Sequence, residues 1–85
     1  MSENWTIYIA GYGTFQFAGT EAEAEDARRN KAAWERGAGY KFRTDLTHES
    51  DRLTAEMVAL WKRGKGVPHQ LLSKLKRAKA REAAA

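Results

Sequence analysis

The feature of the sequence that most constrains the fold is a pair of alternating segments on either side of Gly11-Tyr12-Gly13. In residues 5–10 and 14–18, large apolar side chains alternate with smaller or amphipathic ones, which is the period of a β-strand with one face in a core. The two glycines supply the positive φ of a short hairpin turn and place Tyr12 at its tip. We predict a β-hairpin whose core face carries Trp5, Ile7, Ile9, Phe15 and Phe17 and whose wetter face carries Thr6, Tyr8, Thr14 and Gln16.

A helix is predicted to begin directly after the hairpin. Thr20 and Glu23 have the spacing of a capping box, which places the first helical residue near Glu21. Two glycines, Gly37 and Gly39, are expected to end this helix. Its expected inner face consists of Ala24, Ala27, the Lys31 stem, Trp34 and Ala38.

Aromatic and basic residues alternate in Tyr40-Lys41-Phe42-Arg43-Thr44, which indicates a short third strand with its two rings inward and its two cations outward. The pattern leaves open whether this strand joins the sheet. Thr44 or Asp45 is then expected to cap a second helix that runs to about Arg63. The apolar stripe of that helix is Leu46, Ser50, Leu53, Met57, Leu60 and Trp61.

Gly64, Gly66 and Pro68 predict a tight turn into a third helix. One side of this helix carries Leu71, Leu72, Leu75 and Ala78, and residues 80–85 are expected to fray. The elements together predict an α+β fold of order ββα(β)αα, in which an antiparallel hairpin and a short third strand pack against three helices. Residues 1–85 are expected to form one domain, because so short a chain cannot divide its apolar surface between two cores.

Composition excludes several classes of protein. The chain is 42% hydrophobic and 31% charged, which is the balance of a folded domain. It has no cysteine, so disulfides, thiolate chemistry and the common zinc sites are excluded, and a reducing compartment is favoured. No apolar run approaches the roughly 20 residues that cross a bilayer. We expect a cytoplasmic location and no membrane contact.

Residues typical of catalysis or metal binding are scarce. His48 and His69, the only histidines, each fall in the first turn of a predicted helix, without a companion at the spacing of a catalytic or zinc site. We therefore expect no enzymatic activity, no cofactor and no metal. The acidic group Glu21, Glu23, Glu25 and Asp26 allows a metal site or a mimic of nucleic-acid phosphates, but it also suits the N-terminus of a helix, and that interpretation is favoured.

Charge is distributed unevenly along the chain. Residues 57–85 contain eight basic residues against Glu82 alone, a net charge of +7, which leaves −3 for residues 1–56. Basic side chains at this density can neutralise phosphates, and simple solvation of a helix face is the alternative. The candidate binding residues are Lys62, Arg63, Lys65, Lys74, Arg77 and Arg81, with Lys41 and Arg43 of the third strand. A second candidate surface combines Tyr8 and Tyr12 with those two strand cations, unless the tyrosines only bridge core and water.

Two resemblances bear on function. Residues 60–72 (LWKRGKGVPHQLL) resemble the first helix, turn and second-helix start of helix-turn-helix proteins, with a plain helical hairpin as the alternative. The whole chain, with its hairpin, alanine-rich helix and basic helical end, resembles small proteins encoded by bacteriophages and prophages, among them anti-CRISPR inhibitors. That resemblance implies a non-enzymatic inhibitor in the host cytoplasm, which docks through charged helices on a protein or ribonucleoprotein complex of host defence. A nucleic-acid-binding module is the alternative, and a self-assembling subunit is a third possibility.

Overall fold

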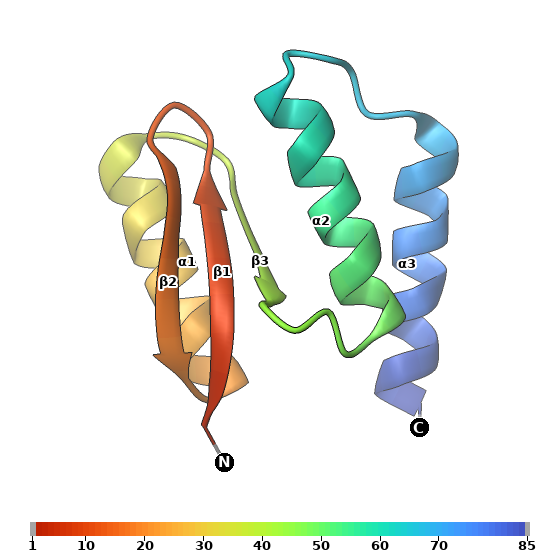
Figure 1. Ribbon diagram of the computed structural model, residues 1–85, viewed down its shortest axis with the longest axis horizontal. Helices are drawn as coiled ribbons and strands as arrows, with labels where there is room; N and C mark the ends of the chain where they lie inside the picture. The colour runs from red at the N-terminus through yellow and green to blue at the C-terminus, as the bar shows by residue number, and fades with distance from the viewer. Residues whose placement is uncertain (1, 85) are drawn as a thin grey trace.

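The computed structural model describes residues 2–84 and has the element order ββαβαα, which confirms the predicted α+β class. A three-stranded antiparallel sheet packs with three helices (Figure 1). The elements are β1 (Glu3–Ile9), β2 (Gly13–Gly19), α1 (Glu21–Glu35), β3 (Gly39–Arg43), α2 (Glu49–Lys62) and α3 (His69–Ala84).

The sheet has the strand order β2-β1-β3, so the third strand does pair, and it pairs with β1. The hairpin prediction is confirmed: Gly11 and Gly13 have φ of 84° and 127°, and Tyr12 is exposed at the tip. Trp5 lies opposite Phe17 and Ile7 opposite Phe15, as the alternation predicts. Because β1 is central, Trp5, Ile7 and Ile9 are almost completely buried.

The prediction that the two cations of the third strand point outward is wrong, whereas the Tyr40 ring does pack inward, on the core of the helices. The register places Lys41 opposite Ile7 and Arg43 opposite Trp5, so both cations lie on the Trp5 face, which α1 covers. Tyr40 and Phe42 lie on the other face. Alternation identifies two sets of side chains but not the face each set takes, and long basic stems can cover an aromatic ring as well as an apolar side chain can.

Helix α1 begins as predicted but packs a different face against the sheet. The Glu23 amide donates to Thr20 Oγ1 at 3.2 Å, and the Thr20 amide donates to Glu23 Oε1 at 2.9 Å, which completes the capping box. Trp34, expected in the core, is 81% exposed. Ala24 is the buried residue of this helix, and the stems of Arg28 and Lys31 extend its packed stripe, so Trp34 is left on the flank of the helix.

Helix α1 ends where the turn that follows it passes close to the backbone at the end of β1. Arg36 takes the left-handed conformation at the C-cap, with φ of 57°. Gly37 follows it, and a Cβ atom at Gly37 would lie 2.3 Å from the carbonyl oxygen of Ala10. Glycine is therefore required here because no side chain fits between this turn and the end of β1.

Helix α2 starts later than predicted. Leu46, expected in its apolar stripe, precedes the helix, has φ of 56° and is exposed. The Asp51 carboxylate accepts the backbone amides of Arg43 at 3.0 Å and His48 at 3.1 Å, and so joins the end of β3 to the start of α2. The three residues before Glu49 are held in this connection instead of in the helix.

Helices α2 and α3 form a plain antiparallel hairpin rather than the steeply crossed pair of a helix-turn-helix motif (Figure 1). Met57, Leu71 and Leu75 form their common core, on which Tyr40 also packs. The hairpin lies beside β3, and the molecule is flat, with extents of 34 × 32 × 19 Å. None of the helices in residues 2–84 is long and apolar enough to cross a membrane.

The last turn of α3 is attached to the start of α2. Within the segment expected to fray, the structure describes helix through Ala84, while Ala85 lies outside the described residues. The Glu82 carboxylate accepts the Ser50 amide at 3.0 Å and the Ser50 hydroxyl at 2.5 Å. Glu82 thereby caps the N-terminus of α2 from a neighbouring helix.

Candidate nucleic-acid interface

The turn between α2 and α3 and the outer side of α3 form the most strongly charged surface of the molecule. No acidic residue occurs between Glu56 and Glu82. The basic side chains of this stretch are exposed, and apart from Arg81 they form no ion pair within residues 2–84. We call this set the cationic surface, and it consists of Lys62, Arg63, Lys65, Lys74, Lys76, Arg77 and Lys79.

Helical periodicity places the α3 cations in solvent. Leu71, Leu75 and Ala78 form the buried stripe, so the residues between them point away from α2. Lys74, Lys76, Arg77 and Lys79 are all exposed. Most of the exposed side chains in the middle of helix α3, from Lys74 to Lys79, are therefore cationic.

Two apolar side chains accompany the cationic surface. Trp61 directly precedes Lys62 and is 42% exposed, and Leu72 of α3 is similarly exposed. The sequence pattern placed both residues in the core, so this association was not predicted. An exposed indole beside cations offers a face on which a base can stack.

The structure separates the predicted binding cations into two groups. Lys62, Arg63, Lys65, Lys74 and Arg77 stay free of carboxylates within the described chain, and Lys76 and Lys79 join them. Arg81 pairs with Glu49 of α2. Lys41 and Arg43, predicted to point outward, lie instead in an ion-pair network between α1 and α2, so their prediction as binding residues loses its geometric basis.

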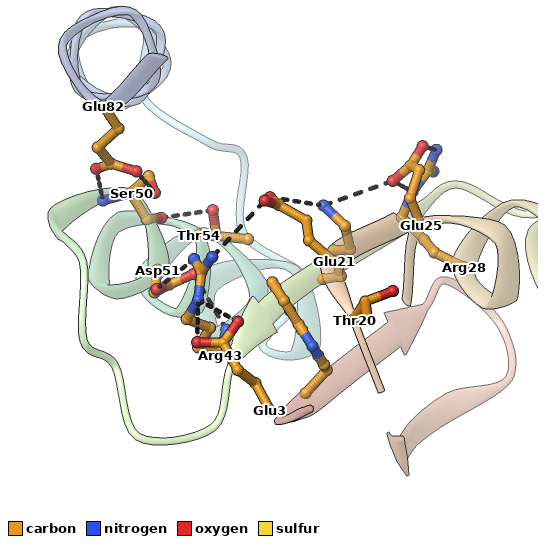
Figure 2. A network of polar contacts seen from close by, with 12 residues as sticks. Glu3, Thr20, Glu21, Glu25, Arg28, Arg43, Ser50, Asp51, Thr54 and Glu82 are labelled. Atoms are coloured by element: carbon orange, nitrogen blue, oxygen red, sulfur yellow. Dashed lines mark hydrogen bonds and ion pairs between the residues drawn. The ribbon is translucent and has the colours of Figure 1, made fainter. Parts of the chain in front are cut away.

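Arg43 is the centre of that network and is 13% exposed (Figure 2). Its guanidinium lies 3.0 Å from a Glu3 oxygen, 3.3 Å from Asp51 Oδ2 and 3.7 Å from Glu21 Oε1. It also lies 4.6 Å from the centre of the Trp5 ring. Burial alone would lower the pKa of Arg43, but the Glu3 and Asp51 carboxylates together raise it. Arg43 thus connects β1, α1 and α2.

Glu25 forms a second centre in the network. Arg28 contacts it with two nitrogens, at 2.6 and 2.9 Å, and Lys41 Nζ lies 3.6 Å away. The hydrogen bonds from Arg28 lower the pKa of Glu25 to about 2, against an opposing effect of burial. Arg28 also donates to the Gly39 carbonyl at 3.1 Å, so this pair fixes the start of β3 against α1.

A groove of about 760 Å³ runs between α1 and the helical hairpin, over β3. Its walls include the paired residues just described, with Leu72, Lys79 and His48 at its margins. Within residues 2–84, every buried side-chain nitrogen or oxygen has a hydrogen-bond partner, and no group of three His, Cys, Asp or Glu residues is arranged to hold a metal ion. Apart from Lys79 and His48, the charged side chains of the groove are hydrogen-bonded or ion-paired within the fold and join α1, β3 and α2.

The structure also places the other residues that the sequence suggested as functional. Tyr8 is buried and faces away from Lys41 and Arg43, so the second candidate surface does not form. Tyr12 is exposed, with Lys31 Nζ 4.1 Å from its ring centre. In the acidic group at the start of α1, Glu23 belongs to the capping box, Glu21 and Glu25 belong to the ion-pair network, and Asp26 is exposed. His69 is exposed at the start of α3.

Comparison with protein-family models, with curated protein sequences and with solved structures finds no match to this chain.

Proposed function

We propose that this protein is a non-catalytic binding protein whose cationic surface contacts the phosphate backbone of a nucleic acid. The nucleic acid can be free or exposed in a nucleoprotein complex. The observation that carries the proposal is the division of the basic side chains between those paired with the protein's own carboxylates and those left in solvent.

Pairing is the normal arrangement elsewhere in this molecule. Lys31, Lys41 and Arg43 each lie within 4 Å of a carboxylate. The cationic surface has no such partners among the described residues 2–84, and its like charges repel one another at low ionic strength. A phosphate backbone supplies the missing negative charge, and release of its counterions favours binding. The arrangement therefore favours a polyanionic partner over a neutral one.

Trp61 makes single-stranded nucleic acid the better-fitting substrate class. Its side chain is 42% exposed and directly precedes Lys62 and Arg63 in the chain, so we expect a base to stack on it while the adjacent phosphates meet the cations. A duplex offers phosphates but no unstacked base. Binding is expected to be tighter to single strands and largely independent of sequence.

The resemblance to phage-encoded inhibitors extends the proposal to a biological setting. An inhibitor of the anti-CRISPR kind that carries this surface would occupy the RNA or the displaced DNA strand of a host-defence complex. The cationic surface is the same in both cases, and only the presentation of the nucleic acid differs. Pull-down from host lysate, with and without nuclease treatment, distinguishes free nucleic acid from nucleic acid within a host complex. A host complex that is bound through its nucleic acid is lost after digestion.

The direct test is fluorescence anisotropy with labelled single-stranded and duplex oligonucleotides at several salt concentrations. If about five phosphates of a duplex are neutralised, log K should fall against log salt with a slope of about −4.5. Charge reversal in Lys74→Glu/Arg77→Glu should abolish measurable binding at physiological salt, and at low salt it should reduce the slope by about two. Trp61→Ala should weaken single-strand binding about tenfold and leave duplex binding nearly unchanged.

The matched control is Arg36→Glu/Arg52→Glu, which changes the net charge equally at exposed positions outside the cationic surface, where neither arginine forms an ion pair within residues 2–84. This control should keep most of the affinity. Equal losses in the two double variants would mean that net charge alone drives binding, and would overturn the assignment to this surface. Binding that is absent, or insensitive to salt, would reject the proposed function.

A further inference from the structure

The two edge strands of the sheet differ in whether their outward backbone groups are hydrogen-bonded. Hydrogen bonds from Ala10 to Ala38 and from Thr44 to Asn4 show that the even-numbered residues of β1 bond to β3. The outward groups of β3 therefore belong to Gly39, Lys41 and Arg43. The Gly39 carbonyl accepts from Arg28, and the Arg43 amide donates to Asp51. This edge is closed by side chains of α1 and α2.

The opposite edge, β2, is open. Odd-numbered residues of β1 bond to β2, so the amides and carbonyls of Thr14, Gln16 and Ala18 point away from the sheet. These backbone groups make no hydrogen bond within residues 2–84. The strand also lacks the devices that protect natural edges, since it has no charge, no proline and no covering helix.

The sequence of β2, Gly-Thr-Phe-Gln-Phe-Ala-Gly, is nearly symmetric about Gln16 in the size of its side chains. We propose that β2 pairs antiparallel with β2 of a second copy of this chain, with Gln16 opposite Gln16 on a two-fold axis. The result is a continuous six-stranded sheet. Three residues on each strand exchange about six backbone hydrogen bonds across the axis. The self-complementary edge makes this an isologous dimer.

Side chains on both faces match across the axis. Phe15 of each copy lies opposite Phe17 of the other in a non-hydrogen-bonded pair, where side chains approach most closely and aromatic pairs are favourable. On the opposite face Thr14 lies opposite Ala18. Both phenylalanines are only half-buried in the single chain, so pairing covers apolar surface that is otherwise wet.

Charge complementarity between the α1 helices of the two copies also supports pairing with a second copy of this chain. The two-fold axis places these helices antiparallel on one face of the joined sheet. Glu23, Ala27 and Trp34 lie on the flank of α1 toward β2, as the contacts of Glu23 with the β2–α1 connection and of Arg28 with β3 indicate. The exposed Trp34 and the basic Arg36 of one copy then approach the acidic start of α1 in the other, which carries Glu23 and Asp26.

Sedimentation equilibrium of nuclease-treated protein tests this proposal. The mass should rise from 9.6 kDa toward twice that value as concentration increases through the micromolar range. Gln16→Lys and Gln16→Glu each place like charges opposite one another on the axis, and each should weaken self-association about tenfold or more. An equimolar mixture of the two variants should restore it as a heterodimer, because opposite charges then meet.

Gln70→Lys controls for the added charge, because it makes the same substitution at an exposed position of α3, far from β2 (Figure 1). It should dimerise like the unmodified protein. Thr6→Val/Thr44→Val controls for the hydrogen bonds that Gln16 Oε1 accepts from Thr6 and Thr44, and it should also dimerise. A monomer at all concentrations, undiminished association of Gln16→Lys, or failure of the mixture to associate would each overturn the proposal. Far-UV circular dichroism of every variant separates loss of pairing from loss of folding. Self-association is measured without nucleic acid, so its failure leaves the proposed function unaffected.

Discussion

At the scale of single residues, the role of each basic side chain depends on whether a carboxylate lies near it. Arg43 and Lys74 are both basic residues at positions that alternation or periodicity predicts to face outward. Arg43 lies among three carboxylates over the Trp5 ring, whereas Lys74 forms no ion pair in the part of the chain that the structure describes. Asp51, which is 4% exposed, depends on Arg43 for charge compensation.

Glu25 should make the stability of this protein sensitive to acid. Its pKa is lowered from 4.5 to about 2 by its hydrogen bonds with Arg28, so the ionised form stabilises the fold. This contribution is fully present above pH 4.5 and is lost as the pH falls toward 2. Urea unfolding between pH 6 and pH 2 should show a smaller loss of stability in Glu25→Gln than in the unmodified protein.

Asp26→Asn is the control for that comparison, because Asp26 is exposed on the same helix and forms no ion pair within residues 2–84. Its pH dependence should follow that of the unmodified protein. A Glu25→Gln curve parallel to that of the unmodified protein would contradict the assigned role of the Arg28 pair.

At the scale of elements, local signals fix where α1 begins, whereas the start of α2 is held both by the local Asp51 carboxylate and by a distant residue. Thr20 and Glu23 form a capping box from within four residues of sequence. The Ser50 amide of α2 is instead capped by Glu82, 32 residues away. Nothing in the local sequence of α2 identifies that partner, and the same contact attaches the end of α3.

Removing this contact should loosen both helix ends. Glu82→Ala should lower the free energy of unfolding by about 1 kcal/mol, as expected for loss of a helix cap. Hydrogen exchange of the Ser50 amide, followed by NMR, should become faster. Glu56→Ala, at an exposed position of α2, should leave this exchange rate unchanged. If residues 80–84 fray in solution, Glu82→Ala will also have no effect.

At the scale of the whole molecule, the free and the paired cations occupy different regions. The paired cations lie between α1, β3 and α2, where they join elements distant in sequence. The cationic surface lies on the helical hairpin beside the sheet. A flat molecule of this shape places its charged hairpin at one side and the open β2 edge at the other (Figure 1). A dimer through β2 would carry a cationic surface at both ends, and two linked sites raise avidity for one long polyanion.

This division predicts opposite effects on stability. Lys74→Glu/Arg77→Glu should change the free energy of unfolding by no more than about 0.5 kcal/mol, because neither side chain has a hydrogen-bond or ion-pair partner among residues 2–84. Arg43→Gln should destabilise the fold by about 3 kcal/mol, because it leaves the buried Asp51 without its cation. Thermal and urea unfolding monitored by circular dichroism measure both. Comparable destabilisation of the two variants would remove the distinction between binding and structural cations.

The sequence by itself determined the elements, the hairpin turn, the α1 cap and most of the cationic surface. These features depend on contacts between near neighbours or on helical periodicity. Lys76 and Lys79 belong to the same acid-free run as the predicted residues, so their omission was avoidable. The exposure of Trp61 was not predictable, because its spacing matches the buried stripe of α2.

Only the tertiary structure decided which face of the sheet received Lys41 and Arg43, and which cations kept a carboxylate within reach. A shift of one residue in strand register exchanges the two faces, and register depends on pairing between distant segments. The exposure of Trp34 has the same origin, because the rotation of α1 is set by packing of Ala24, Arg28 and Lys31 on the sheet. Local patterns say which side chains share a face, and long-range packing decides what that face meets.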